Sequence, residues 1–442
     1  MNLEASLDLK KVVVSENVAG LLSEEDRSKI ANEVIDTYQM DLGSRSEWEE
    51  RMKTALNLAL QVAETKTFPW PNAANVKFPL ITVAALQFHA RAYSAMIPGP
   101  DIVKCQTFGE DPDGSKSARA TRVSGHMSYQ ILEEDESWED NHDRVLITVP
   151  IIGCAFKKSY FDSFLGHNVS ENVLAKDLVI PYFAKSLEQA SRLTHRLEVS
   201  ENYILTRERK GLFCAPPAEQ PAQYNGFSSE LDRAASVAQG VSPAYNDPST
   251  PQELLEQHCW LDLDGDGFAE PYVVTVRMDT AHLCRIVARF HSSGVKRNST
   301  NEVYHIDAIN YFTKYPFIPS PDGGIYDLGF GILLGPLNES INTLINQLLD
   351  AGTLSTTAGG FLGRGAKLRS GETSFKPFEW KRVDSTGDDL RKNIVPLDTK
   401  PPSQVLFALL QLLINYGERV GGASPGPVRG RVPSRPTTIG NL

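Results

Sequence analysis

Residues 321–354 read PDGGIYDLGFGILLGPLNESINTLINQLLDAGTL, and this stretch decides the architecture that we expect. Its apolar residues recur at helical spacing, which predicts one amphipathic helix over residues 331–352. Polar residues fall on a different face of the same helix. They are Glu339, Asn342, Asn346 and Asp350. The helix is therefore expected to have one apolar side and one polar, carboxamide-rich side.

A second helix is expected about 50 residues further along the chain. Residues 403–420 read SQVLFALLQLLINYGERV, again with apolar residues at helical spacing. Between the two helices, short apolar runs alternate with glycine, serine and charged residues, which predicts strands over 360–362, 375–383 and 393–397. A helix that leads out, a small β-rich tip and a helix that returns form a hairpin that projects from a body.

Length, composition and charge narrow the class of protein. A chain of 442 residues is long enough for two or three domains with a sizeable core. The net charge of −11 argues against general affinity for nucleic acid. Five widely spaced cysteines without a CxxC pair indicate neither a disulfide framework nor a zinc site, and they fit a reducing compartment. The N-terminus does not resemble a signal peptide, and no run of 18 apolar residues predicts a membrane helix.

The rest of the chain predicts an α+β body. Residues 1–20 are expected to form a flexible arm, and residues 21–328 the body, which is helical to about residue 150 and mainly β after it. Ser46 and Glu49 have the spacing of a capping box at the start of a helix over 47–63. Residues 215–251 are rich in proline, glycine, serine and glutamine and predict an insertion on the surface.

One local motif has the residue types of a metal site. Asp262, Asp264 and Asp266 alternate, and Gly267 stands at the sixth position of the calcium-loop pattern, where a sharp turn is needed. The bidentate glutamate of that pattern is absent at the twelfth position, and Glu270 at the ninth is the one further candidate ligand. Two readings stay open: a β-hairpin turn built on Asp-Gly pairs, and a structural Ca²⁺ or Mg²⁺ site.

Residues 70–93 contain one extended motif. It consists of Trp70, Pro71, Ala73, Asn75, Val76, Lys77, Pro79, Leu80, Phe88, His89, Ala90, Arg91, Ala92 and Tyr93. The motif resembles a signature near the start of portal proteins, the head-to-tail connectors of tailed bacteriophages, from the short-tailed enteric phage group. Thr194, His195 and Arg196 are similar to a second short motif of that family.

The resemblance implies a portal-like α+β fold and a structural role without enzymatic activity. Residues 21–328 would be the wing, 329–352 the first stem helix, 353–400 the clip and 401–420 the return helix. The subunit would join others in a ring, expected to be dodecameric, at one capsid vertex in the virion after assembly in the bacterial cytoplasm. Double-stranded DNA would pass through its channel during packaging and ejection. The expected protein partners are the terminase large subunit, tail adaptors, and capsid and scaffolding proteins, with no membrane involved.

Two sets of residues gain expected roles from the resemblance. The polar face with Glu339, Asn342, Asn346 and Asp350 would line the channel or meet a neighbouring subunit. A basic cluster in the clip would dock an acidic motor or adaptor protein, although a solvated loop face explains it equally well. The cluster consists of Arg364, Lys367, Arg369, Lys376, Lys381 and Arg382.

Residues 421–442 do not fit the family. Their proline, glycine and arginine content without apolar periodicity predicts a disordered tail. We therefore expect the chain to lack the tunnel loop and crown that portals carry after the return helix. Two alternatives stay open: another multimeric phage connector, and a metal-dependent enzyme that uses Asp262, Asp264 and Asp266. The enzyme would need a nucleophile or general base near the metal, and the sequence supplies no recognisable one.

Overall fold

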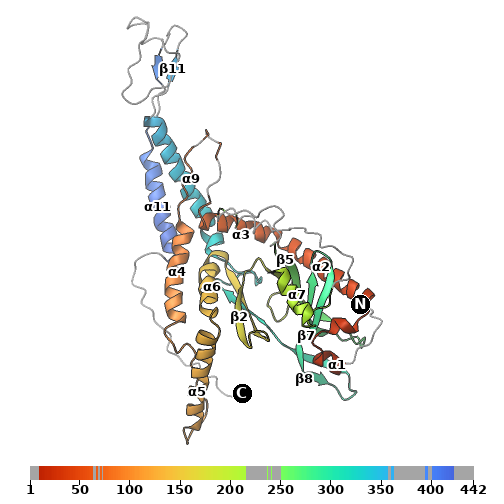
Figure 1. Cartoon of the computed structure of the whole chain (residues 1–442). Helices are drawn as coiled ribbons and strands as arrows, with labels where there is room; N and C mark the ends of the chain where they lie inside the picture. The colour runs from red at the N-terminus through yellow and green to blue at the C-terminus, as the bar shows by residue number, and fades with distance from the viewer. Residues whose placement is uncertain are drawn as a thin grey trace.

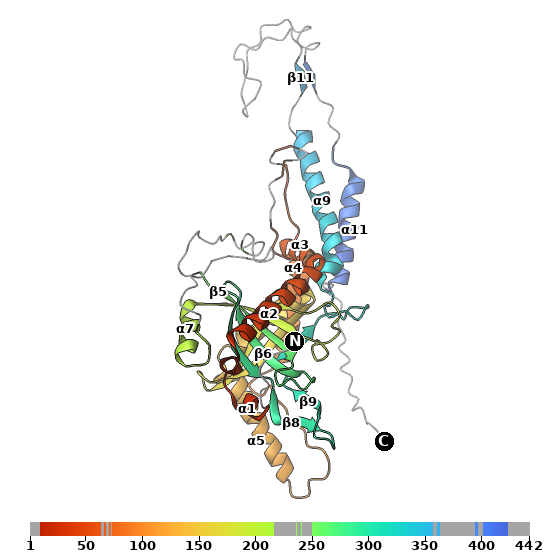
Figure 2. The same ribbon diagram turned by 90° about the vertical axis from the view of Figure 1, so that its right-hand side faces the viewer.

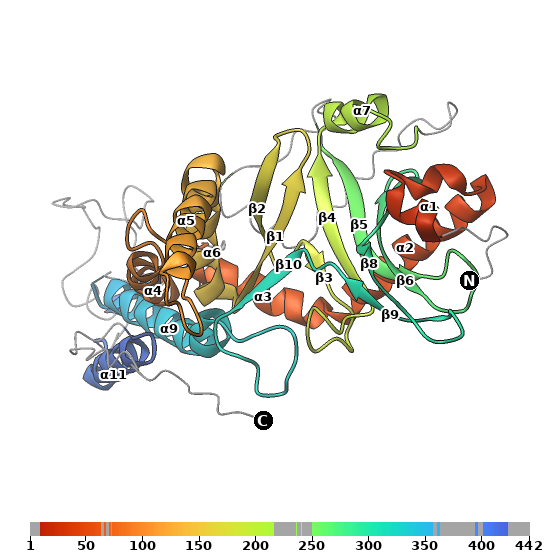
Figure 3. The same cartoon turned by 90° about the horizontal axis from the view of Figure 1, so that it is seen from below.

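The computed structural model describes residues 9–62, 66–67, 70–71, 73–215, 236, 240, 250–356, 360–362, 394–396 and 401–422. The chain is a mixture of helices and strands, which confirms the predicted α+β class. Among the described helices, none combines the length and the apolar character that crossing a membrane requires. Helices α4 (Leu80–Met96), α6 (Trp138–Ile152), α9 (Phe330–Thr356) and α11 (Gln404–Val420) gather on one side of the sheets, and α1 (Leu9–Val14) and α2 (Glu24–Ser44) lie on the other (Figure 3).

The N-terminal region differs from the flexible arm expected over residues 1–20. Residues Leu9–Val14 form helix α1, and Val18–Leu21 form a short 3-10 helix, η1. Val12, Val18 and Ala19 are fully buried, in one core cluster with strands β6 (Glu270–Arg277) and β7 (His282–Ala288). The expectation was wrong from residue 9 onward because these apolar side chains cover the edge of a sheet that forms from residues hundreds of positions later in the chain.

Helices α2 (Glu24–Ser44) and α3 (Ser46–Ala59) follow. Ser23 caps α2, but the predicted capping box at Ser46 is wrong, since Arg45 is the N-cap residue of α3 and makes no side-chain cap. The Arg45 guanidinium is buried and donates to the main-chain carbonyls of Ala175, at 3.0 Å, and Leu178, at 2.8 Å. Glu49 pairs with Arg45 at 2.9 Å, so its carboxylate neutralises a buried cation and does not cap the helix.

The β part of the body consists of antiparallel pairs throughout the described strands. The strand orders are β3-β4-β5-β6-β7, β10-β1-β2 and β8-β9, so the expected change from helix to strand near residue 150 is confirmed. The bounds are Cys154–Asp162 for β1, His167–Val173 for β2, Leu178–Val179 for β3, Leu193–Val199 for β4, Gln252–Leu261 for β5, Glu270–Arg277 for β6, His282–Ala288 for β7, Phe290–Arg297 for β8, Val303–Ala308 for β9 and Phe312–Pro316 for β10.

The remaining helices of the body join the sheets to the projecting part. Helix α7 (Glu201–Arg209) packs on the end of the five-stranded sheet. Helices α4 (Leu80–Met96) and α6 (Trp138–Ile152) pack against each other and both contact α9. Helix α5 (Ser115–Tyr129) runs into a π-helical turn over Gln130–Glu134 (η2) and lies at the end of the molecule opposite the projection (Figure 1).

The predicted hairpin is present. Helix α9 (Phe330–Thr356) and helix α11 (Gln404–Val420) pack side by side and project from the body, and we call this pair the stem (Figures 1 and 2). At its tip, β11 (Gly360–Leu362) pairs antiparallel with β12 (Ile394–Pro396). Two of the three strands predicted for the tip are therefore confirmed, whereas residues 375–383 lie outside the described residues. The first stem helix continues four residues beyond its expected end at 352.

Close backbone packing fixes the root of the stem. At Gly331, near the start of α9, a β-carbon would overlap the side chain of Ala55 in α3. At Gly153, just after α6, the backbone has a φ of +110° and lies against the main chain of Asp327. Only glycine combines this conformation with this lack of space. A side chain in place of either glycine would not fit, so the segment around the start of α9 can approach α3 and the end of α6 closely.

Candidate functional site

The polar side of α9 holds an extended segment of the body. The side-chain oxygens of Asn342, Asn346 and Asp350 accept hydrogen bonds from main-chain N–H groups of an extended segment that precedes α4. Asn346 also donates from Nδ2 to the carbonyl of Val76 at 3.1 Å. We call these residues and their partners the ladder. Its N–H bonds are Phe78 to Asn342 at 2.7 Å, Val76 to Asn346 at 2.7 Å and Ala74 to Asp350 at 2.8 Å.

The spacing of the ladder follows from the geometry of its two components. Four residues of α-helix rise about 6.0 Å, and two residues of extended chain span about 6.6 Å. Side chains at positions i, i+4 and i+8 of a helix can therefore meet every second N–H group of an extended segment. Because these N–H groups face a helix and have no strand beside them, the amide and carboxylate oxygens of α9 replace a sheet partner.

The expected channel face is therefore wrong for three of its four residues. Asn342 and Asn346 are 6% and 5% exposed, and Asp350 is half-buried, so these side chains are engaged within the chain. Of the four residues, Glu339 is the one whose side chain is exposed. The sequence signal was the spacing of three amide or acidic residues, but their partner is a segment about 270 positions earlier that no local pattern connects to them.

Helix α11 carries two apolar faces. Leu410, Leu413 and Ile414 pack against the body and α9. Val405 and Leu412 are 76% and 64% exposed and lie on a second side of the same helix, next to the packed side. The exposed side, which we call the outer stripe, follows the spacing i, i+4, i+7, i+11 and i+15 that is typical of one helix face. It consists of Val405, Leu409, Leu412, Tyr416 and Val420.

The aspartate loop lies in the turn between β5 and β6, as predicted. One carboxylate oxygen each from Asp262, Asp264, Asp266 and Glu270 lies within 4.8 Å of the others, so the structure brings all four candidate ligands together. Glu270 is fully buried at the start of β6. Burial, reinforced by the charge of Asp264, raises the pKa of Glu270 to about 8.

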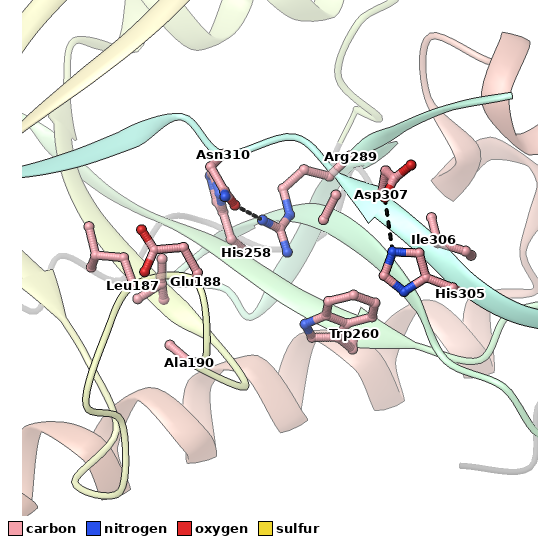
Figure 4. A pocket seen from close by; sticks show the side chains of 12 residues that line it. Leu187, Glu188, Ala190, His258, Trp260, Arg289, His305, Ile306, Asp307 and Asn310 are labelled. Carbon is pink, nitrogen blue, oxygen red and sulfur yellow. Dashed lines mark hydrogen bonds and ion pairs between the residues drawn. The ribbon is translucent and has the colours of Figure 1, made fainter. Parts of the chain in front are cut away.

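One pocket of the described residues lies between β5, β9 and the loop before β4. Its volume is about 310 Å³, and its lining includes Trp260, His258 and Arg289. Arg289 points toward Asn310 and donates to its Oδ1 at 3.3 Å (Figure 4). Burial lowers the pKa of this guanidinium. The pocket offers polar contacts, but none of the described residues in its lining is a serine, cysteine or threonine that could act as a nucleophile.

His195, which stands in the second family-like motif, is a buried residue of the core. Its ring is buried edge-on against Phe312, with 5.8 Å between ring centroids. Burial, with the nearby Lys158 ammonium, lowers the pKa of His195 to about 3. The imidazole is therefore neutral at ordinary pH and belongs to the core between two sheets.

The basic cluster expected in the clip lies outside the described residues. It consists of Arg364, Lys367, Arg369, Lys376, Lys381 and Arg382. The same holds for most of the insertion expected over 215–251 and for residues 423–442 of the expected tail.

Comparison with known proteins adds no family assignment. No protein-family model matches this chain, and no curated protein matches it. The resemblance to portal proteins therefore rests on the sequence motifs, and what it implies stays a prediction. The geometry of the stem carries the functional proposal.

Proposed function

We propose that this chain is a structural subunit of a phage portal, which assembles into a ring around a channel for DNA. The observation that carries the proposal is the projecting stem with the uncovered outer stripe of α11. A helix that is apolar on two sides is normally covered on both. In the isolated chain one side of α11 faces the body and the other faces solvent, so the stem is incomplete as a monomer.

A second copy of the same chain is the occupant that we propose for the outer stripe. Large exposed apolar patches mark interaction sites. If the stripe meets a different surface of the next subunit, the contact is heterologous, and repeated heterologous contacts with a closing rotation form a ring. The stems of such a ring would stand side by side, with the β11–β12 tips at one end, as the portal reading requires.

The remaining portal properties belong to the same proposal. The ring would sit at a capsid vertex of the virion, pass double-stranded DNA, and dock the terminase and tail adaptors through the tip. The net charge of −11 suits a conduit, because contacts to phosphate that repeat around a ring would hold the DNA. No catalytic step is proposed for the chain.

The proposal is tested by the mass and shape of the purified protein. We expect native mass spectrometry to give one closed oligomer and negative-stain images to show rings with a central hole. The variant Val405→Glu with Leu412→Glu should assemble at least tenfold more weakly, because both side chains are exposed in the monomer and their charges would be buried between subunits.

A matched control separates the outer stripe from a general effect of charge. The variant Gln404→Glu with Gln411→Glu adds the same two charges at exposed positions of α11 outside the outer stripe, and should assemble normally. A wild-type protein that stays monomeric at tens of micromolar would contradict the ring. Equal assembly of the two double variants would contradict the role of the outer stripe.

A further inference from the structure

We propose that the turn between β5 and β6 binds one Ca²⁺ ion, held by Asp262, Asp264 and Asp266 and closed from the buried side by Glu270. This inference does not depend on the proposed portal function. The sequence left open a plain hairpin turn or a metal site, and we favour the metal site. Glu270, at the ninth loop position, would be the fourth carboxylate ligand.

The four carboxylates stand close enough for one ion. Their oxygens lie within 4.8 Å of one another. Calcium binds oxygen at about 2.3–2.6 Å, so two ligands on opposite sides of the ion are about 4.6–5.2 Å apart. A single Ca²⁺ can therefore contact all four groups without a large movement of the turn.

The buried side chain of Glu270 supports a bound ion independently of the closeness of the carboxylates. Its side chain is 0% exposed, and its Oε1 atom has no hydrogen-bond partner among the described residues. The other oxygen, Oε2, accepts from the Tyr272 hydroxyl at 3.2 Å and the Leu263 N–H at 3.4 Å. A carboxylate oxygen is costly to bury without a partner, and a cation between Glu270 and the aspartates would supply one.

Backbone N–H groups of the turn hold the Asp262 carboxylate in place. Asp262 accepts hydrogen bonds from the N–H groups of Gly265, at 2.7 Å, and Gly267, at 3.1 Å. Both glycines have a positive φ, of +72° and +89°. Asp266 is exposed, so the ion would reach the site from solvent, while Glu270 closes it from the core.

The spacing gives a shorter site than the twelve-residue calcium loop. The twelfth position is Val273, which lies inside β6 and pairs with His258 and Val287, so it offers no carboxylate. Glu270 replaces it at the ninth position, at the point where β6 begins. Calcium is favoured over magnesium, because magnesium demands a near-ideal octahedron and usually retains several waters.

The ion would have a structural effect. Glu270 pairs with Leu261 at the end of the β5–β6 ladder, and Tyr272 is buried in the core with Phe290. A bound ion would therefore connect the exposed turn to the core of the body and hold the end of the hairpin. Metal binding of this kind stabilises the folded state by mass action.

Terbium, which replaces calcium in oxygen sites, provides the direct test on the full chain. Tyr272 and Trp260 are close enough to the turn to sensitise Tb³⁺ emission under ultraviolet excitation. We expect saturable emission that Ca²⁺ displaces with a Kd of about 10⁻⁵–10⁻³ M, and that Mg²⁺ displaces at least tenfold more weakly. The melting temperature should rise with Ca²⁺ concentration and fall back on chelation.

Three variants make the result specific. Glu270→Gln retains the shape and the hydrogen-bond acceptor but loses the charge, and should weaken Ca²⁺ binding at least tenfold. Asp266→Asn should do the same at an exposed position where folding is not at risk. Glu302→Gln, in the β8–β9 turn, is the control and should bind as the wild type does. Absence of saturable Tb³⁺ emission, equal displacement by Mg²⁺, or unchanged affinity in both ligand variants would overturn the proposal.

Discussion

The ladder between α9 and the segment before α4 makes a quantitative prediction. Changing Asn342 and Asn346 to alanine removes two acceptors and leaves the N–H groups of Val76 and Phe78 without partners. A donor that loses its partner costs about 1–3 kcal/mol where it is buried, and less at Val76, which is 46% exposed and can be reached by water. Because the two sites are one helical turn apart and share the same segment, their effects will not add fully. We expect the double variant to lose about 1–4 kcal/mol of stability.

Urea denaturation and native-state hydrogen exchange measure this loss. The midpoint of unfolding should fall without a change in m-value if the segment detaches only on global unfolding. If it detaches locally, the amides of Val76 and Phe78 should exchange about tenfold to a hundredfold faster while the core amides are unaffected. The second pattern places the loss in the ladder, and the first measures its contribution to global stability.

Two single changes on the same helix serve as controls. Gln347 is exposed and outside the ladder, so Gln347→Ala should change stability by less than about 0.5 kcal/mol. Asn338 lies one turn before the ladder and is fully buried without a hydrogen-bond partner among the described residues, so Asn338→Leu should be neutral or stabilising. A double alanine variant as stable as the wild type, with protected Val76 and Phe78 amides, would refute the ladder and restore the channel-facing reading.

Three further predictions test other parts of the structure. Gly153→Ala should destabilise the protein by about 3 kcal/mol, because the backbone there has a positive φ and a β-carbon would overlap the main chain of Asp327. Gly352→Ala, in open space inside α9, should stabilise the protein by about 0.5–1 kcal/mol in the same thermal denaturation experiment. The pKa of His195 is lowered to about 3, so below pH 6.5 this histidine is protonated in the unfolded state and neutral in the folded state. Between pH 7 and 5.5 the wild type should therefore lose about 1 kcal/mol more free energy of unfolding than His195→Gln. His126→Gln, at an exposed position, is the control. Burial lowers the pKa of Lys157 to about 8, so at pH 7 the folded protein holds a charged ammonium at an unfavourable site. Lys157→Met should therefore stabilise the protein by about 1–3 kcal/mol at pH 7, and this gain should shrink as the pH rises from 8 to 10.5.

Local patterns were sufficient for the elements of the stem and for the aspartate loop. Helical periodicity predicted both stem helices, and the alternation of short apolar runs predicted the two strands at the tip that the structure describes. The aspartate loop was found because all four of its carboxylates lie within nine residues of each other. In each of these cases the interacting groups are neighbours in sequence, so spacing alone carries the information.

Only the tertiary structure decided what the polar and apolar faces contact. Asn342 and Asn346 have the same side chains whether they line a channel or hold an extended segment, and their partner comes from residues 74–78. Glu49 has the spacing of a capping residue, yet it pairs with Arg45 because that cation is buried under the carbonyls of β3 and the loop before it. The burial of Glu270 likewise depends on β6 packing into the core. A residue type fixes which bonds a side chain can make, but the partner is chosen by chain segments that packing brings together from distant parts of the sequence.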